Sequence, residues 1–462
     1  MIFHSTRGND SGKTFEEVLM QGLASDGGLF MPDEWPQVDI NHIQHLETFI
    51  DVAKYIVPMF TKSSFSDEEV LSLLDSTWHD FSEENFVKIH QLNESNDILE
   101  LFHGPTAAFK DFGLQLAAAF FNLSLTKNNK TAIVFGATSG DTGSAAIDAC
   151  KRFDSIKSFI LLPEGNMSDV QRKQMTTVDS PNVFTLSIDG TFDDCQSIVK
   201  EAFNERPFLK DDQFLLAVNS INWVRIIGQI CYYFYASLKI SKNNESLNFA
   251  VPTGNFGNVF ACYSAYKMGM PLNKILVAVN DNNILHRFFS ENDYSKKSVA
   301  ETVSPSMDIS IASNFERLVY DFYTERDSSL CKDFYSNFPS TPIKIEDDSW
   351  KKSKDLFLSY CVDDFSTVGA MKDIYKEYSY LIDPHTAVAS KAVEVLKDKL
   401  AGKTVVLSTA HPAKFPLVVK NAGLDIKNIP ASLSEIFDKK EKIYNFPASK
   451  DQIFDFITKN NQ

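Results

Sequence analysis

The sequence predicts an α/β protein built on mainly parallel, twisted sheets. From residue 99 onward, short apolar strands alternate with amphipathic helices, and glycine-rich loops lie where a strand meets the next helix. In this pattern the helices cover both faces of a parallel sheet. Ligands bind at the carboxyl ends of the strands in such sheets, so these loops mark the edge where a site is expected.

Four strand–turn–helix units carry the fold prediction, each starting with an apolar strand bounded by turn residues. Their strands are predicted at 131–135, 158–162, 182–188 and 248–251, with helices that end near 153, 203 and 268. Further strands are expected at 98–102, 274–279 and 404–408. A helix is expected over 384–400, because proline is tolerated in a first helical turn.

Residues 1–94 are predicted to form a mostly helical N-terminal region. Apolar residues recur at helical spacing over 15–22, 42–59 and 66–78, between polar or proline-containing breaks. The chain has 462 residues, which is more than one hydrophobic core usually serves. We therefore expect two or three domains.

The composition excludes several classes of protein. Hydrophobic residues make up 44% and charged residues 23%, as in ordinary globular proteins. A net charge of -16 disfavours nucleic acid as a partner, because its phosphates must be neutralised by clustered Lys and Arg. A small anionic substrate is still allowed, since local groups set the field inside a pocket.

The cysteines and apolar stretches indicate a cytoplasmic protein without a metal site. The six cysteines are widely separated, with no CxxC pair and no metal-type spacing, which favours a reducing compartment. The first residues lack the features of a signal peptide. The longest apolar stretch, near 226–236, is interrupted by Gly228 and Gln229, so no membrane segment is expected.

Lys110 is the first candidate catalytic residue. It opens a predicted helix between Phe109 and Phe112. The two aromatic side chains favour partial burial, which lowers the pKa of an amine and makes it a usable nucleophile and base. A single lysine is more often structural than catalytic, so this segment alone leaves both interpretations open.

The loop 137–143 is a candidate anion site. It contains two glycines and four side chains that carry oxygen. Peptide N–H groups at such a turn, with the helix dipole behind them, favour a carboxylate or a phosphate. An ordinary N-capping turn is an equally good interpretation. The loop has neither the P-loop spacing nor the full dinucleotide-binding pattern.

The loop 251–258 and Thr409 complete the candidate segments. Gly254 and Gly257 let the backbone come close to a ligand. The loop contains no lysine, so it fits a bound cofactor phosphate better than a phosphate that is transferred, which would need Lys and Mg²⁺. The hydroxyl of Thr409 could hydrogen-bond a ring nitrogen, although a helix cap is the commoner role of such a residue.

Taken together and in this order, the four segments resemble the threonine synthase family of pyridoxal-phosphate enzymes, whose fold is shared with tryptophan synthase β-subunits. The resemblance covers essentially the whole chain. Residues 5–8 and 26–30 are similar to the N-terminal signature of the family's longer form, although Ala107 stands where the family commonly has Leu. Other blocks similar to the family are 219–222 with Arg225, 281–283, 307–310 and 383–387.

The resemblance implies that two α/β lobes within residues 95–462 clasp pyridoxal 5'-phosphate. It implies that Lys110 holds the cofactor as an imine and that Thr409 faces its pyridine nitrogen. The residues expected to bind the cofactor phosphate are Gly254, Asn255, Phe256, Gly257 and Asn258. Those expected around the substrate carboxylate are Ser139, Gly140, Asp141 and Thr142. Candidates for the substrate phosphate are Arg225, Lys414 and the loop 5–7, and Asn222 is expected among the substrate-binding residues.

Arg225 is the candidate that the sequence leaves most open. It lies one helical turn after Asn222, so both side chains could project toward one pocket. A guanidinium is suited to a bidentate grip on phosphate. The alternative is a helix-surface arginine paired with a nearby carboxylate.

The implied reaction converts O-phospho-L-homoserine and water to L-threonine and phosphate, with the cofactor as electron sink. Lys110 is the expected base, and a closure of the lobes over the substrate is expected because the intermediates must be kept from water. One alternative is a lyase that releases a 2-oxo acid and ammonia, and another is a non-catalytic protein that binds the cofactor. The sequence leaves monomer and homodimer equally open.

Overall fold

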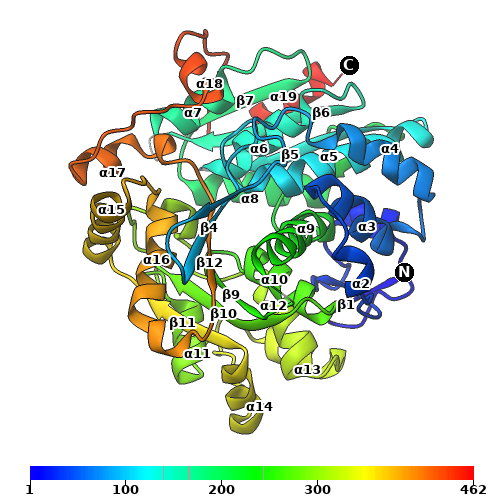
Figure 1. Cartoon of the computed structure of the whole chain (residues 1–462). Helices are drawn as coiled ribbons and strands as arrows, with labels where there is room; N and C mark the ends of the chain where they lie inside the picture. Colours follow the sequence, from blue (N-terminus) through cyan, green and yellow to red (C-terminus); the bar gives the residue numbers. More distant parts are fainter. Residues whose placement is uncertain (139, 165–166, 243, 462) are drawn as a thin grey trace.

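The computed structural model describes residues 1–138, 140–164, 167–242 and 244–461. Two separate sheets lie one above the other in Figure 1, with helices packed around both and the N-terminal helices at one side. The predicted α/β class with mainly parallel sheets is confirmed.

The larger sheet has six strands in the order β11-β10-β9-β12-β4-β3. All neighbouring strands are parallel except β3 and β4, which are antiparallel. Its strands are β3 (Lys88–Gln91), β4 (Asn96–Glu100), β9 (Leu247–Pro252), β10 (Leu272–Val279), β11 (Phe357–Cys361) and β12 (Thr404–Ser408). β3 lies before residue 94 and pairs with β4, which lies after it, so this sheet extends across the predicted domain boundary. The division of the chain at residue 94 stays a prediction.

The second sheet has five parallel strands in the order β13-β7-β6-β5-β8. Its strands are β5 (Thr131–Ala137), β6 (Ile156–Pro163), β7 (Val183–Asp189), β8 (Gln213–Leu216) and β13 (Tyr444–Pro447). Every strand predicted from an apolar run is present within a few residues. In these two sheets the strands that were not predicted are β3, β8, β11 and β13, which are short and mostly half-exposed. The strands β3 and β13 contain no continuous apolar run.

The N-terminal region is mostly helical, as predicted, and also contains the antiparallel pair β1 (Phe3–Ser5) and β2 (Phe30–Pro32). The single helix expected over 42–59 is wrong. Thr48 and Asp51 form a capping box that starts a new helix, because each side chain accepts a backbone N–H of the other residue. The helices of this region are α1 (Phe15–Gln21), α2 (Ile40–Ile43), α3 (Phe49–Thr61) and α4 (Asp67–Thr77).

The remaining helices surround the two sheets (Figure 1). They are α5 (Lys110–Lys127), α6 (Asp141–Cys150), α7 (Asp169–Thr176), α8 (Phe192–Glu205), α9 (Trp223–Ile240), α10 (Gly257–Lys267), α11 (Ile284–Glu291), α12 (Phe315–Leu318), α13 (Ser328–Ser336), α14 (Asp347–Lys352), α15 (Asp364–Tyr378), α16 (Pro384–Leu396), α17 (Pro416–Asn421), α18 (Ala431–Ser434) and α19 (Lys450–Asn460).

Helices α5 and α9 cross at two glycines in the interior of the molecule. A Cβ at Gly113 would lie 3.0 Å from the Arg225 Cα, and one at Gly228 would lie 2.9 Å from the Phe112 carbonyl oxygen. Side chains at these positions would therefore force the helices apart. The crossing fixes the start of α5 relative to the start of α9, where two candidate residues, Lys110 and Arg225, lie.

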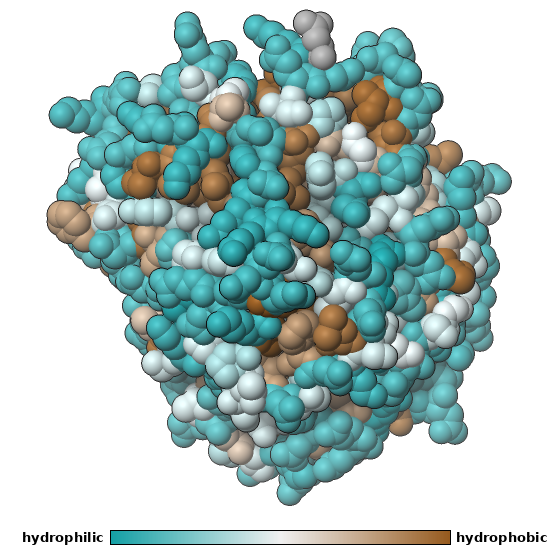
Figure 2. Space-filling view, turned by 90° about the horizontal axis from the view of Figure 1, so that it is seen from below, coloured by the Kyte–Doolittle hydropathy of each residue, from teal (hydrophilic) through white to brown (hydrophobic). Residues whose placement is uncertain are grey.

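The outer surface offers few features of its own. Among the described residues, no helix is long and apolar enough to cross a membrane. Figure 2 shows one face as mainly hydrophilic, with apolar residues in small separate groups.

Replacing Gly228 by alanine should lower the free energy of unfolding by about 1–3 kcal/mol, because the added methyl group meets the backbone of α5. Gly369→Ala is the matched control, since a Cβ at this helical position would have no heavy atom within 4 Å. We expect Gly369→Ala to raise stability by up to about 1 kcal/mol through helix propensity. Urea unfolding of both variants checks this, and equal effects would contradict it.

Candidate active site

Lys110 is the first residue of α5, and the segment before it pairs with the segment after β12. The Phe109 N–H donates to the Thr409 carbonyl at 2.9 Å, and the His411 N–H donates to the Ala107 carbonyl at 3.1 Å. This pairing brings Lys110 close to Thr409. The Thr409 hydroxyl is hydrogen-bonded to none of the described residues, so it is free to meet a ligand.

The surroundings of Lys110 lower the pKa of its amine. Burial lowers the pKa of Lys110 to about 8, Asp141 opposes this shift, and the cations Arg225 and Lys414 add to it. At about pH 8, half of these amines are neutral. A neutral amine is the form that attacks a carbonyl or accepts a proton, so Lys110 is suited to both tasks.

The loop between β9 and α10 presents unpaired N–H groups. The peptide N–H groups from Gly254 to Asn258 have no acceptor within the described part of the chain. Phe256 adopts a left-handed conformation with φ 65° directly before α10. The Asn314 backbone and side chain both donate to the Asn255 carbonyl, at 3.0 and 3.1 Å. The loop is thus held by its carbonyl groups while its N–H groups stay free for an anion.

Asn258 adds a further donor to this loop. Its side-chain oxygen accepts the hydroxyls of Tyr232 and Tyr233, at 2.5 and 2.7 Å. These bonds orient the amide, whose Nδ2 is buried without a partner among the described residues. A buried donor without an acceptor costs about 1–3 kcal/mol, and a bound phosphate oxygen would remove that cost.

The loop between β5 and α6 is the second candidate ligand loop, and Ser139 lies outside the described residues. The Thr138 hydroxyl accepts the N–H groups of Gly140 and Gly143, at 3.3 and 3.1 Å. A Cβ at Gly143 would lie 2.1 Å from the Thr138 Cγ2, so only glycine fits there. The Thr142 hydroxyl has no partner among the described side chains and backbone groups.

The Asp141 carboxylate contacts three other side chains of this region. Its Oδ1 pairs with the Lys414 ammonium at 2.8 Å and accepts the Gln171 amide at 2.9 Å, and its Oδ2 accepts the Ser306 hydroxyl at 3.2 Å. Burial by itself would raise the pKa of Asp141, but Lys414 and Lys110 hold that pKa well below its usual range. Asp141 is therefore ionised inside the protein.

Lys414 is fully buried between the two sheets. Its ammonium donates to the Thr106 carbonyl at 2.7 Å in addition to its ion pair with Asp141. Two of its three donors are therefore used by the protein itself.

Asn222 and Arg225 lie at the start of α9. The Asn222 side chain caps the helix through the Val224 N–H and donates to the Leu19 carbonyl at 2.8 Å. Arg225 is 3% exposed and donates from Nη1 to the Val218 carbonyl at 3.0 Å, whereas its Nε is buried without a partner in the described structure. Burial lowers the pKa of Arg225 to about 10.

The alternative interpretation of Arg225 as a surface residue is therefore wrong. Arg225 is buried, and it takes part in none of the ion pairs between described residues. A buried guanidinium without a carboxylate partner is costly unless an anion completes the site.

The side chains of the loop 5–7 are committed to other partners. Arg7 forms a two-point pair with Glu316, with Nε and Nη2 at 2.9 and 2.7 Å from the carboxylate oxygens. The Ser5 hydroxyl donates to Asp26 at 2.7 Å. These contacts tie the N-terminal segment to the rest of the molecule.

The charged groups that act on the Lys110 amine are two cations and one carboxylate, Asp141, so positive charge is in excess around this amine. The cations are Lys414 and Arg225. Within the described chain, no three His, Cys, Asp or Glu side chains are grouped so that they could hold a metal ion. The arrangement therefore suits an organic ligand with phosphate or carboxylate groups rather than a metal.

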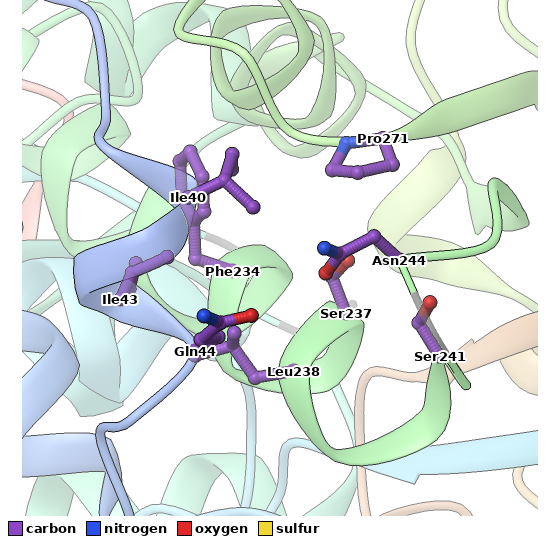
Figure 3. Close-up of a pocket in the computed structure, with 9 residues that line it drawn as sticks. All are labelled: Ile40, Ile43, Gln44, Phe234, Ser237, Leu238, Ser241, Asn244 and Pro271. Carbon is purple, nitrogen blue, oxygen red and sulfur yellow. The ribbon is translucent and has the colours of Figure 1, made fainter.

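A separate surface pocket lies between α2 and the C-terminal end of α9 (Figure 3). Its volume is about 260 Å³. Its lining residues are Ile40, Ile43, Gln44, Phe234, Ser237, Leu238, Ser241, Asn244 and Pro271. None of these side chains is charged, so this pocket lacks the chemistry of the Lys110 site.

The residues around Lys110 fit pyridoxal phosphate: an amine for its aldehyde, a free hydroxyl for its ring nitrogen and a set of unpaired N–H groups for its phosphate. A family model described as "Pyridoxal-phosphate dependent enzyme" matches residues 98–332, and this fold and site define a pyridoxal-phosphate-dependent enzyme. Models for the threonine synthase N terminus and C-terminal region match residues 2–78 and 386–457. The chain belongs to the threonine synthase family.

Similar proteins cover the chain from end to end. The threonine synthase of Pseudomonas aeruginosa is 40% identical over 461 residues, which are 99% of this chain and 98% of that protein. The Saccharomyces cerevisiae enzyme is 38% identical over 96% of this chain and 94% of its own. A crystal structure of PLP-bound threonine synthase from Brucella melitensis aligns with a TM-score of 0.95 at 36% identity, covering 100% of both chains.

The sequence analysis did not identify several residues that build the site. Gln171, Ser306 and Asn314 hold the two ligand loops, yet none of them stands in a recognisable motif. Their roles depend on contacts with distant segments, so only hydrogen-bonding side chains in loops could have suggested them.

Removing one partner of the buried ion pair between Asp141 and Lys414 should destabilise the folded protein. Lys414→Met is expected to lower the free energy of unfolding by about 3–5 kcal/mol, because Asp141 would keep a buried, unpaired charge. The matched control is Lys391→Met, which breaks the exposed pair with Glu394 and should cost less than about 1 kcal/mol. Denaturant unfolding measures both, and similar losses would argue against the buried charge pair.

Proposed function

We propose that the chain converts O-phospho-L-homoserine and water to L-threonine and phosphate. The observation that carries the proposal is the buried, positively charged site around Lys110, which offers separate donors for two phosphates. One set is the free N–H groups of Gly254 to Asn258, and the other is the Arg225 guanidinium, whose Nε has no partner among the described residues. Membership of the threonine synthase family supports this substrate.

The cofactor's phosphate is assigned to the β9–α10 loop, and its ring nitrogen to Thr409. Gly254, Asn255, Phe256 and Gly257 contribute backbone N–H groups, and Asn258 adds its side-chain amide. A neutral hydroxyl at the ring nitrogen leaves that nitrogen without a full positive charge. When bound, pyridoxal phosphate supplies an electron sink that acidifies the carbon–hydrogen bonds next to the substrate's amine.

Lys110 is assigned two tasks. Its amine holds the cofactor, and once the substrate amine displaces it, the same amine moves protons at the substrate's α- and β-carbons. Its pKa near 8 is suited to both directions of proton transfer around neutral pH. Arg225 and Lys414 favour the neutral form of the amine, and Asp141 keeps it from losing its proton too readily.

The substrate's anionic groups are assigned to two places. The loop of Ser139, Gly140, Asp141 and Thr142 is proposed for the carboxylate, supported by the free Thr142 hydroxyl and the helix N-terminus. Arg225, at the helix start capped by Asn222, is proposed for the phosphate. Lys414 is proposed to act through Asp141, because it neutralises a carboxylate that would otherwise repel the substrate.

Contacts between the sheets support a closed site that excludes water. Besides the Asp141–Lys414 pair, the Gln174 amide donates to the Thr106 carbonyl at 2.9 Å, and the Ser168 hydroxyl to the Lys414 carbonyl at 3.1 Å. We propose that these contacts form between two lobes of residues 95–462 and open to admit substrate.

The enzyme is proposed to be a carbon–oxygen lyase acting on phosphates, located in the cytoplasm as a monomer or homodimer. The free state of all six cysteines supports a reducing compartment. Analytical ultracentrifugation of the purified protein distinguishes the two oligomeric states.

Product analysis tests the function directly. The purified protein with O-phospho-L-homoserine should release threonine and phosphate in equal amounts, and 2-oxobutyrate as the main product would establish the alternative lyase.

Lys110→Ala should lower turnover by at least roughly 10²–10⁴-fold and remove the visible cofactor absorption. Lys127→Ala, at the exposed end of the same helix, is the matched control and should retain both.

Arg225→Leu tests the phosphate assignment. Loss of charged hydrogen bonds to the substrate should raise KM for O-phospho-L-homoserine roughly 10- to 100-fold, with a much smaller change in cofactor affinity. Arg152→Leu is the control, because this partly buried arginine donates to the Ser76 and Thr77 carbonyls at the far end of α6. An unchanged KM in Arg225→Leu would require another phosphate ligand.

A further inference from the structure

The short turn η1 (Pro305–Met307) touches both ligand loops at once. The Ser306 hydroxyl donates to the Oδ2 of Asp141, a residue of the loop assigned to the substrate carboxylate, at 3.2 Å. A Cβ at Gly254 would lie 2.9 Å from the Ser306 carbonyl oxygen, so the turn also packs directly on the loop assigned to the cofactor phosphate. Ser306 is therefore in contact with both loops.

His385 holds this turn from the other side. The Ser306 N–H donates to the His385 Nε2 at 3.1 Å, and the His385 Nδ1 lies 2.7 Å from the Asp383 Oδ2. An N–H that points at Nε2 requires this nitrogen to be an acceptor, so the ring proton lies on Nδ1. His385 is 2% exposed and its ring packs against Phe415.

Both ends of the turn are also held by side chains other than His385. The Asn280 amide donates to the Ser304 hydroxyl at 3.0 Å and to the Asp308 carboxylate at 2.8 Å. Asp308 also accepts the Asn282 amide at 2.9 Å. Blocks 281–283, 307–310 and 383–387, to which the resemblance assigned no role, thus converge on the turn that contains Ser306.

We propose that His385 is a positioning residue: its Nε2 holds Ser306 so that the cofactor-phosphate loop and the substrate loop keep the spacing that the reaction needs. The predicted effect on KM rests on the proposed function, because that function names the substrate. The predicted effect on cofactor binding does not depend on it. A merely structural histidine would contribute packing alone, and its loss would affect stability without a selective change in ligand binding.

The experiment compares His385→Leu with His385→Gln in the full-length enzyme. Leucine keeps the apolar packing and removes the acceptor, whereas glutamine places an oxygen near the former Nε2. Asp383 remains satisfied in both variants, because it still accepts the backbone N–H groups of residues 385 and 386 and the Thr386 hydroxyl. Both proteins are therefore expected to fold.

His385→Leu should raise KM for O-phospho-L-homoserine and Kd for pyridoxal phosphate about tenfold each, as expected for one lost hydrogen bond. His385→Gln should return both constants to within about threefold of the parent. His286→Leu is the matched control, since this half-buried histidine contacts Ser359 at the edge strand β11, and it should change neither constant.

Two results would overturn the proposal: unchanged KM and Kd in folded His385→Leu, or a glutamine variant as defective as the leucine variant. Thermal melting of each variant shows whether a change in KM or Kd comes only from loss of folded protein. If the parent produces no threonine, the proposed function fails, yet the cofactor Kd values of the same variants still decide whether His385 positions the loop.

Discussion

The buried ion pair between Asp141 and Lys414 is the constraint around which the site is arranged. Asp141 opens the helix that follows β5 of one sheet, and Lys414 follows β12 of the other, yet their charged atoms are 2.8 Å apart. Neither side chain exposes more than 4% of its surface, so separating the charges would leave each one in a medium of low polarity. The pair therefore holds the sheets together at the point where the ligand loops meet.

The same region explains how an acidic chain binds anions. The whole sequence carries a net charge of -16, but the charged groups around Lys110 have an excess of cations. The unpaired N–H groups before α10, the Asn258 amide and the Arg225 Nε add donors without acceptors. A buried donor without an acceptor costs free energy, so an anion bound by the Asn258 amide and the Arg225 Nε would also stabilise the fold.

Most of the fold could be predicted because the relevant signals are local. Apolar runs bounded by turn residues identified the buried strands, and the loops with Gly254 and Gly143 were recognised from residues that adjoin in the chain. Two of the missed features lack such signals: β13 is half-exposed, and the break between α2 and α3 depends on one capping box at Thr48. Ser306 and Gln171 were missed because their partners lie far away in the sequence.

The sequence by itself determined the α/β class, the family resemblance, and the prominence of Lys110, the two glycine-rich loops and Thr409, because these follow from periodicity and from motifs of neighbouring residues. Only the tertiary structure decided that Lys414 pairs with Asp141, that Arg225 is buried without a carboxylate, and that His385 holds Ser306. These features depend on burial and on contacts between distant segments, and such contacts exist only once the two sheets have packed together.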